Sequence, residues 1–414
     1  MLDKSAAIRS ATRRHDPRSG RSVGAAIAAA LYTHFLVTVA FIDTMAQLPL
    51  LSPFAVSLGA GATLVGVILG AYSLVNMVGN VVAGPVIDRV GRRVTLVAGM
   101  LVAGCAVAAY ALVTTPWQLF GLRLAHGAGG AILIPAAYAY VGDRSVRGSV
   151  GRSMGYAGAA VALAALIGPA LGGMGRDAFG IRPVFLGIGA LLVATAVSAI
   201  WLVHDGTGAA PFNGPAAKVA AVPPRVRAAI GDPDLRYAYL SVFSLSFTMG
   251  VLAYTFPLTM QGAGFSAART GSFFSIFSAA AILVLVLPTN RLSDRFGRGP
   301  LVTVGSVAIA LALAFLTFSR SVASLTAVMA LYGAGYGTVF PSACAIVVDR
   351  TAASNRGTAF GIFYASFSLG VTIGPVAAGL ATGAGLNAYW LPVGVLVIVR
   401  LVLLGRRPRA TPAG

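Results

Sequence analysis

Long apolar stretches alternate with short polar segments along almost the whole chain. Each stretch runs for about 18 to 25 residues, the length that a helix needs to cross roughly 30 Å of hydrocarbon. The pattern predicts helices, because a backbone surrounded by lipid must satisfy its hydrogen bonds within its own segment. The expected spans are 26–51, 62–85, 94–113, 117–141, 152–174, 183–203, 237–260, 267–289, 300–318, 322–347, 357–381 and 387–404. The predicted fold class is therefore an all-α membrane protein with twelve transmembrane helices.

The spans fall into two sets of six, separated by a polar segment. Residues 204–236 are rich in Pro, Gly, Ala and charge, and they read as a cytoplasmic linker with room for one short surface helix. The expected division is a tail at 1–25, a half at 26–203, the linker at 204–236, a half at 237–404 and a tail at 405–414.

An internal repeat relates the two halves with an offset of 206 positions. GPVIDRVGRR (84–93) corresponds to NRLSDRFGRG (290–299), HGAGGAILIP (126–135) to YGAGYGTVFP (332–341), and IGPALGG (167–173) to IGPVAAG (373–379). Because each half has an even number of spans, both have the same orientation in the membrane. This predicts two six-helix parallel repeats, an arrangement that transporters use to rock about a central site.

Composition agrees with a membrane protein and restricts its partners. The chain is 57% hydrophobic and 10% charged, and its net charge is +19. Of the 30 Lys and Arg, 25 lie in the tails and on the linker side of the spans, and only Arg176, Arg182, Arg269 and Arg320 lie on the other side. This bias predicts that both termini are cytoplasmic. The cations are not gathered on one folded domain, so no nucleic-acid partner is expected.

Two formal charges are expected within the hydrocarbon, away from the ends of the spans, Asp43 and Arg123. Each costs about 2.5 to 3.5 kcal/mol at the centre of a bilayer, which favours a functional role. The structural alternative is a fixed ion pair between them that only tethers two helices. His126 follows Arg123 by one turn, and it could either relay protons or donate to a backbone carbonyl. Cys105 and Cys344 lie in apolar spans, so neither a disulfide framework nor a metal site is expected.

Several motifs resemble the major facilitator superfamily, and the resemblance covers residues 26–404. GPVIDRVGRR resembles the family's signature loop between helices 2 and 3, and RLAHGAGGA from Arg123 resembles its helix 4 arginine block. GYAGAAVALAALIGPALGG (155–173) resembles the helix 5 signature of the twelve-helix drug:proton antiporters. FIDTMAQLPLLSPFAVSLGA (41–60) resembles helix 1 of that group and of vesicular amine transporters. His126 is a departure, since the family more often has glutamine there.

The resemblance implies a central cavity lined by helices 1, 4, 7 and 10, and hence a set of site residues. Proton coupling is expected at Asp43, Arg123 and His126, with Asp43 alternately holding a proton and a cationic substrate. Substrate contacts are expected from polar and aromatic side chains facing the same cavity: Asp43, Gln47, Phe35, Tyr72, Asn76, Tyr138, Phe243, Phe247, Tyr254, Tyr332, Tyr336 and Phe340. Several of these could instead form only contacts between helices.

Two further motifs are expected to act in conformational change. A charged latch is predicted at the linker side: Gly84, Asp88, Arg89, Gly91, Arg92, Arg93 and Asp143 in the first half, and Asp294, Arg295 and Arg298 in the second. The alternative is that its arginines only anchor loops to anionic headgroups. Close helix packing is predicted at the helix 5 motif: Gly155, Gly168, Pro169, Gly172 and Gly173.

These features predict a proton-coupled exporter of lipophilic or cationic small molecules that works by alternating access. We expect a monomer in the inner (cytoplasmic) cell membrane, driven by the proton gradient and without a cofactor. The alternatives are an importer or facilitator of a small metabolite and a non-transporting receptor or scaffold. An enzyme is not expected, because the chain has no nucleotide loop, metal-ligand cluster or serine elbow.

Overall fold

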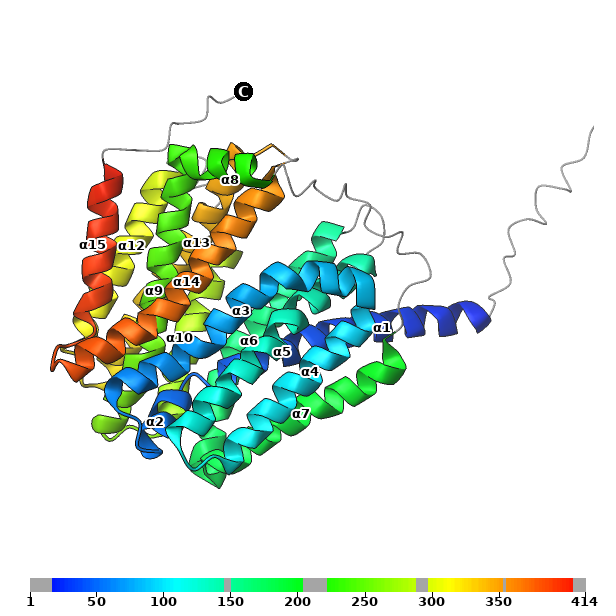
Figure 1. The fold of residues 1–414 in the computed structure, drawn as a ribbon, viewed down its shortest axis with the longest axis horizontal. Coiled ribbons are helices and arrows are strands. Elements are labelled where there is room, and N and C mark those ends of the chain that lie inside the picture. Colours follow the sequence, from blue (N-terminus) through cyan, green and yellow to red (C-terminus); the bar gives the residue numbers. More distant parts are fainter. Residues whose placement is uncertain (1–16, 145–149, 204–221, 288–296, 353–354, 405–414) are drawn as a thin grey trace, which may run out of the picture.

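The computed structural model describes residues 17–144, 150–203, 222–287, 297–352 and 355–404, and within them the regular elements are helices (Figure 1). The first half contains α1 (Pro17–Ala46), α2 (Leu51–Ser57), α3 (Ala62–Val90), α4 (Arg92–Ala109), the 3-10 turn η1 (Tyr110–Leu112), α5 (Pro116–Asp143), α6 (Val150–Phe179) and α7 (Ile181–Leu202). The second half follows the linker helix α8 (Val222–Gly231). It contains α9 (Pro233–Gly262), α10 (Ala267–Val286), α12 (Arg298–Leu316), α13 (Val322–Arg350), α14 (Arg356–Gly383) and α15 (Trp390–Leu404).

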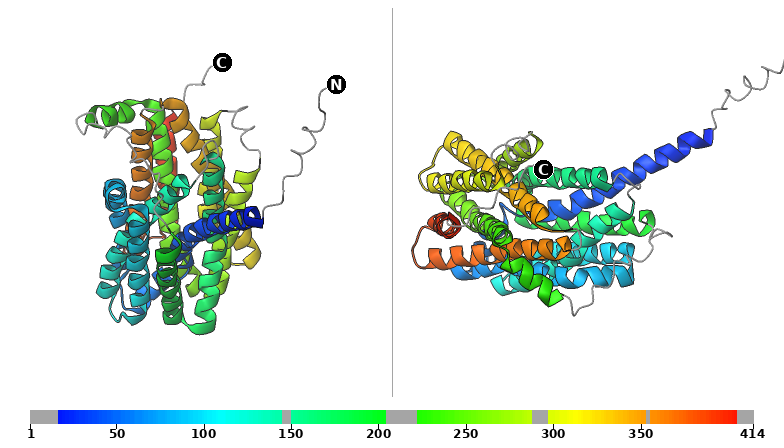
Figure 2. Two further views of the ribbon diagram at one scale, coloured as in Figure 1. Left: turned by 90° about the vertical axis from the view of Figure 1, so that its right-hand side faces the viewer. Right: turned by 90° about the horizontal axis from the view of Figure 1, so that it is seen from above.

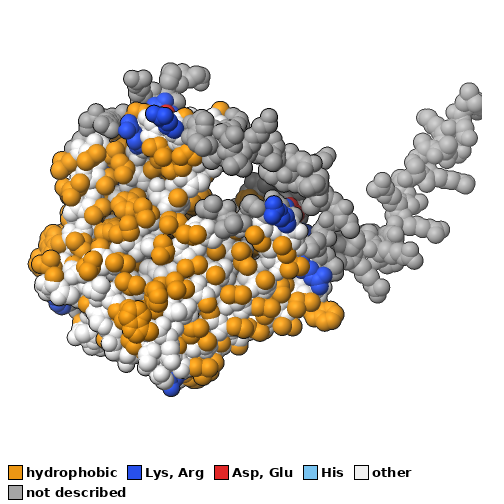
Figure 3. Space-filling view, viewed as in Figure 1, with side chains coloured by type: hydrophobic (Ala, Val, Ile, Leu, Met, Phe, Trp, Pro, Cys, Tyr) orange, Lys and Arg blue, Asp and Glu red, His pale blue; other side chains and the backbone are white. Residues whose placement is uncertain are grey.

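The helices account for the twelve predicted spans. Ten are long and apolar enough to cross a membrane, α1 and α2 form a broken span bent by 46°, and α15 is a shorter apolar helix. Hydrophobic side chains cover the middle of the face in Figure 3, and arginines lie towards its margins. The predicted all-α membrane fold is confirmed.

The first span differs from its prediction at both ends. Its helix begins at Pro17 instead of residue 26, and the early part of α1 projects beyond the bundle (Figure 2). It ends at Ala46 instead of continuing to residue 51. Pro49 explains the break, because proline has no N–H to donate to the preceding turn and its ring clashes with that turn.

Matching positions in the two halves have the same structure. Thr115 and Ser321, which are 206 positions apart, each start a helix with a capping box. Small residues also recur at the contact between the third and fourth helices of each half. A Cβ added to Gly99 would lie 3.0 Å from the Gly129 carbonyl oxygen, and one added to Gly305 would lie 2.9 Å from that of Gly335. The repeat therefore extends to the packing of each half.

The two halves meet where α3 and α10 begin, which we call the closed end. There α3 packs on α14 and α6 packs on α10. A Cβ added to Gly70 would lie 2.6 Å from the Thr372 carbonyl oxygen, so the backbones touch. The hydroxyl of Tyr254 also donates across the contact to the Ala62 carbonyl, at 3.1 Å. From this end the halves diverge in Figure 1 towards the opposite end, which we call the arginine end because α4 and α12 begin there with arginines.

Candidate functional site

A buried polar cluster joins α1 to α5 inside the first half. Oδ2 of Asp43 lies 2.8 Å from Nε2 of His126, and Gln47 donates to Oδ1 of Asp43 at 2.7 Å. The exposed fraction is 2% for Asp43, 3% for Gln47 and 0% for His126. Water therefore does not reach this carboxylate in the conformation described, and its polar partners come from the protein.

Aromatic hydroxyls and a cation surround His126. The Tyr110 hydroxyl lies 3.0 Å from Nδ1 of His126, so both ring nitrogens have a polar partner. The Tyr72 ring lies with its centroid 4.7 Å from that of His126, and Cζ of Arg123 lies 4.9 Å from the Tyr72 ring centroid. The cluster thus combines a carboxylate, an imidazole and a guanidinium.

Arg123 does not pair with Asp43. Its guanidinium donates to the carbonyl oxygens of Ile68 and Leu69 in α3, at 3.3 and 3.1 Å. The fixed ion pair considered from the sequence is therefore wrong, and Arg123 instead holds α3 against α5. The carbonyl partner considered for His126 is also wrong, because its two nitrogens face Asp43 and Tyr110.

The second half has a neutral contact at the equivalent place. Tyr332 stands 206 positions after His126, and its hydroxyl lies 2.7 Å from Oγ1 of Thr248 in α9. Tyr332 is fully buried. The link between the first and fourth helices thus occurs in both halves, but it can carry charge only in the first.

The remaining predicted substrate residues separate into groups. Tyr336 and Phe340 stack with centroids 6.3 Å apart, Tyr138 lies edge-on to Phe41 at 6.4 Å, and Phe243 lies 6.1 Å from Phe247. A Cβ added to Gly130 would lie 3.2 Å from the Asn76 amide nitrogen and would also contact the Tyr72 hydroxyl, so these two side chains pack against α5.

Three predicted substrate residues do not line a shared cavity in this conformation. Tyr254 and Tyr332 are almost fully buried, and the hydroxyl of Tyr254 is used in the closed end. Phe35 has an exposed fraction of 46% and lies 6.2 Å from Tyr32. Burial of the two tyrosine rings between helices leaves no surface for a ligand in this conformation.

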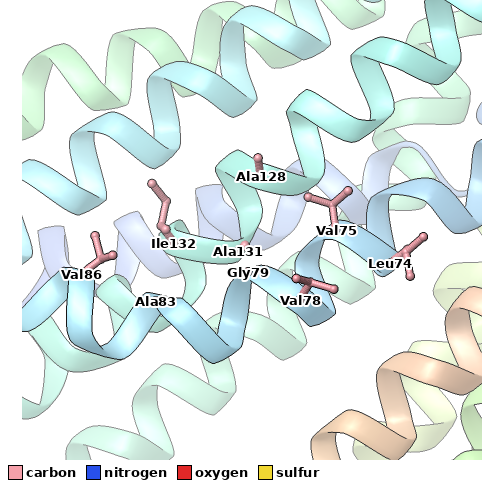
Figure 4. A pocket seen from close by; sticks show the side chains of 9 residues that line it. All are labelled: Leu74, Val75, Val78, Gly79, Ala83, Val86, Ala128, Ala131 and Ile132. Atoms are coloured by element: carbon pink, nitrogen blue, oxygen red, sulfur yellow. The ribbon is translucent and has the colours of Figure 1, made fainter.

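An apolar pocket of about 360 Å³ lies between α3 and α5 (Figure 4). Its lining side chains are all apolar: Leu74, Val75, Val78, Gly79, Ala83, Val86, Ala128, Ala131 and Ile132. None of the predicted site residues belongs to this lining. The pocket is therefore distinct from the Asp43 cluster.

The latch residues form matching ion pairs at the arginine end. Nε of Arg92 lies 2.9 Å from Oδ2 of Asp143, and 206 positions later Nε of Arg298 lies 3.4 Å from Oδ2 of Asp349. Arg93 also donates to the Ile200 carbonyl in α7. Each ion pair stays within its own half.

Glycine is required at the turn directly before the latch arginine in each half. Gly91 between α3 and α4 has φ +96°, and Gly297 before α12 has φ +82°. Arg89 is exposed. The surroundings of Gly84, the side chain of Asp88 and residues 288–296, which include Asp294 and Arg295, lie outside the described part of the structure.

The helix 5 motif makes close contacts at four of its five positions. A Cβ added to Gly168 would lie 2.8 Å from that of Met45, and one added to Gly172 would meet the Ala46 carbonyl. Gly173 faces the backbone of Ala267, and the Pro169 carbonyl faces Gly271, so this part of the motif seals α6 against α10. Gly155 differs. A Cβ there would have nothing within 4 Å, and its predicted packing role is wrong for this conformation.

Three polar residues in strong contacts were not among the predicted site residues. The Tyr110 hydroxyl is hydrogen-bonded to His126, but in the sequence this tyrosine stands in an apolar run with no feature that marks it. Asp177 accepts from the backbone N–H groups of Ala267 and Ala268 across the closed end, at 3.1 and 2.7 Å. Arg400 was assigned to the cytoplasmic end of its span, yet it donates to the Tyr237 hydroxyl at 2.7 Å and ties α15 to α9.

Residues 33–286 and 238–414 match the sequence model of the family described as Major Facilitator Superfamily. Multidrug resistance protein 2 of Bacillus subtilis is 22% identical over 89% of this chain and 92% of its own length. The class G tetracycline resistance protein of Vibrio anguillarum is 27% identical, over 84% of this chain and 88% of its own.

Solved structures share the fold. A mutant form of the nucleoside transporter NupG superposes with a TM-score of 0.77 at 14% identity, covering 91% of this chain and 99% of its own. A bacterial homologue of the human lysosomal transporter Spinster, in an inward-facing and occupied conformation, also gives 0.77 at 15% identity, covering 93% and 98%.

Proposed function

This chain belongs to the Major Facilitator Superfamily, and from that premise we propose that it is a proton-coupled exporter of lipophilic or cationic small molecules. It is a membrane transporter and not an enzyme. Its substrate is a small molecule. The direction of transport, the coupling ion and the chemical class of the substrate are what we propose.

The observation that carries the proposal is the contact between Asp43 and His126. A buried carboxylate paired with a permanent cation makes a poor proton carrier, because the pair already balances its charge. Asp43 instead faces an imidazole, a group that can either donate or accept a hydrogen bond and a proton. A proton and a cationic substrate then compete for the same carboxylate, and exchange follows because Asp43 cannot hold both.

The way that the halves meet supports alternating access. The excess of Lys and Arg on one side supports a cytoplasmic arginine end with both termini in the cytoplasm, so this conformation is open inward. Release to the other side requires the closed end to separate and the two halves to approach each other at the arginine end. The ion pairs of Arg92 and Arg298 fix helices within each half during that motion.

Lipophilic cations and neutral amphiphiles fit the site better than anionic metabolites do. The aromatic groups of α13, represented by Tyr336 and Phe340, offer apolar and cation-attracting surface. Relatives whose names give multidrug and tetracycline resistance support export of such compounds. We place the protein in the inner membrane, acting as a monomer and powered by the proton gradient without a cofactor.

Transport of tetraphenylphosphonium into inverted proteoliposomes tests the proposal. The wild type should accumulate this lipophilic cation when the vesicle interior is acidic and should also exchange it without a gradient. Asp43→Asn should lose the gradient-driven accumulation. Thr248→Val, at the neutral contact of the second half, is the matched control and should keep the response to the gradient.

Gradient-driven accumulation by Asp43→Asn at the wild-type rate would overturn the coupling role. Accumulation by the wild type only in vesicles of the opposite orientation would indicate an importer. Folding of each variant is checked by its elution as a single species and by its thermal midpoint.

A further inference from the structure

We propose that an aromatic surface on α13 and α14 binds the apolar body of a lipophilic cation while the halves are open at the arginine end. The surface consists of Phe340 in α13 and of Phe360, Phe363, Tyr364 and Phe367 in α14. The four rings of α14 are not among the predicted substrate residues. The inference rests on the proposed export of lipophilic cations, and it adds the place where such a cation first binds.

The five rings form one continuous contact between the two helices. The ring centroid of Phe340 lies 5.8 Å from that of Phe363 and 6.0 Å from that of Phe367. Phe363 also meets Tyr364 edge-on with centroids 5.6 Å apart, and its centroid lies 6.0 Å from that of Phe360. Phe363 is fully buried, so it holds the more exposed rings in fixed positions. The aromatic surface therefore exists before a ligand arrives.

Tyr364 lies on the side of α14 that faces the first half. Its exposed fraction is 53%. Nine residues, or about two and a half turns, separate it from Ile373, so the two stand on opposite sides of the helix. Ile373 is exposed together with Leu369 and Leu380, which gives that side an apolar face suited to lipid. An electrostatic interaction with Tyr138 of α5 places Tyr364 on the side of the first half.

The first half does not cover α14 at the level of Tyr364. Nearer the closed end the halves touch, where a Cβ added to Gly70 would meet the Thr372 carbonyl oxygen. Gly361 stands about three turns before Thr372 on the same face, yet a Cβ added there would have nothing within 4 Å. Ala365, about two turns before Thr372, is exposed. Space for a ligand therefore begins beside Tyr364, where α14 lies next to the diverging first half (Figure 1).

The chemistry of the aromatic surface fits a cation that is shielded by apolar groups. Ring faces attract a cation within about 6 Å of the centroid, and ring edges pack well against the rings of a ligand. The five residues supply no carboxylate, so a compact ammonium ion would lose its hydration there without a charged partner. Because water does not reach Asp43 in this conformation, a ligand that enters from the arginine end meets the aromatic surface first.

The equivalent positions of the first half carry no aromatic side chain. With the offset of 206, they are Ile134, Met154, Ala157, Gly158 and Val161. The helix pairing of the repeat therefore does not require these rings, because the same helices of the first half are built without them. The first half has the buried carboxylate and the second half has the rings, a division that suits a ligand with one charge and an apolar body.

Equilibrium binding of radiolabelled tetraphenylphosphonium to the purified protein, without a gradient, tests the inference. Tyr364→Leu and Phe360→Leu should each weaken binding about fivefold, because each variant loses one ring face. Tyr364→Phe keeps the ring and should bind as the wild type does. Phe315→Leu is the matched control, because it removes a ring of similar exposure, 54%, in α12 outside the aromatic surface. Its affinity should stay at the wild-type level.

A neutral ligand separates attraction of the charge from apolar contact. Triphenylphosphine oxide presents similar phenyl rings without a net charge. Its binding should weaken much less in Tyr364→Leu than the binding of tetraphenylphosphonium does, because leucine keeps the apolar contact and loses only the ring face. Equal losses for the two ligands would overturn the assignment of the aromatic surface to cations.

Unchanged tetraphenylphosphonium affinity in both Tyr364→Leu and Phe360→Leu would overturn the inference, and so would a wild type that does not bind this cation. Elution as a single species and the thermal midpoint verify that each variant is folded. Because binding is measured without a gradient, normal binding combined with a loss of gradient-driven accumulation by the wild type would contradict the proposed proton coupling alone.

Discussion

His126 and Tyr332 occupy equivalent positions in the two halves, and each reaches from the fourth helix of its half to the first. His126 contacts the carboxylate of Asp43 at 2.8 Å, whereas Tyr332 contacts the hydroxyl of Thr248 at 2.7 Å. The same helix contact is thus made once with groups that exchange protons and once with groups that stay neutral. If the protein is proton-coupled as proposed, this asymmetry favours the first half as the site of coupling.

Paired substitutions at these two positions should separate coupling from packing. His126→Gln should flatten the pH dependence of gradient-driven tetraphenylphosphonium uptake, because an amide cannot exchange a proton with Asp43. Tyr332→Phe removes a hydroxyl whose hydrogen-bond partner within the described residues is Thr248. It should keep the pH dependence while lowering the free energy of unfolding by about 1 kcal/mol. Equal flattening in both variants would contradict this division.

Arg123→Ala should destabilise the first half. The substitution leaves the carbonyls of Ile68 and Leu69 without this donor. Hydrogen bonds to charged groups contribute roughly 1.5 to 3 kcal/mol, so we expect a loss of about 2 kcal/mol in the free energy of unfolding. Denaturant unfolding in mixed micelles measures this change. Arg123→Lys keeps the charge but not the planar guanidinium group. Its free energy of unfolding should lie between that of the wild type and that of Arg123→Ala.

Gly173→Val should open the closed end. A side chain there would collide with the backbone of Ala267, so the contact between α6 and α10 cannot form without a shift. A cysteine at Ser52, which is fully buried, should then react with an impermeant maleimide in a background without the native cysteines. Gly155→Val in the same helix is the control, because that position has open space, and it should leave labelling at the wild-type level.

Asp143→Asn should slow turnover more than Asp349→Asn does. The Arg92–Asp143 contact is 2.9 Å long, whereas the Arg298–Asp349 contact is 3.4 Å long, and shorter charge-assisted bonds are stronger. Substrate binding should change little in either variant, because both pairs lie at the arginine end. Steady-state uptake together with equilibrium binding of tetraphenylphosphonium distinguishes the two effects. A larger effect of Asp349→Asn would reverse the assignment of the stronger latch.

Asp88→Asn, predicted from the sequence motif alone, should also slow turnover.

Much of the architecture could be predicted, because each transmembrane helix must be apolar and must form its backbone hydrogen bonds within itself. Apolar length gave the spans, and the offset of 206 gave the pairing of positions such as Gly99 with Gly305. The break after Ala46 could not be predicted from length, because it depends on Pro49 lying within an otherwise apolar run. In the same way, the length of the apolar run did not predict that α1 begins at Pro17.

The site was only partly predictable, because sequence gives residue types without their partners. Asp43 and Arg123 were identified by the cost of placing charges in lipid, and His126 by its position one turn after Arg123. The three do lie close together. Which of them contacts Asp43 depends on how α3 approaches α5, since two carbonyl oxygens of α3 accept hydrogen bonds from Arg123. Tyr110 had no sequence signal, because its hydroxyl matters only beside an imidazole from another helix.

Proton release on binding tests the central claim most directly, namely that Asp43 holds either a proton or a cation. Purified protein in weakly buffered detergent solution is mixed with tetraphenylphosphonium while a pH indicator dye records protons set free. The wild type should release protons on binding, with the amount falling as the starting pH is raised and Asp43 is already deprotonated. Asp43→Asn should release none, and release by this variant equal to that of the wild type would contradict the account.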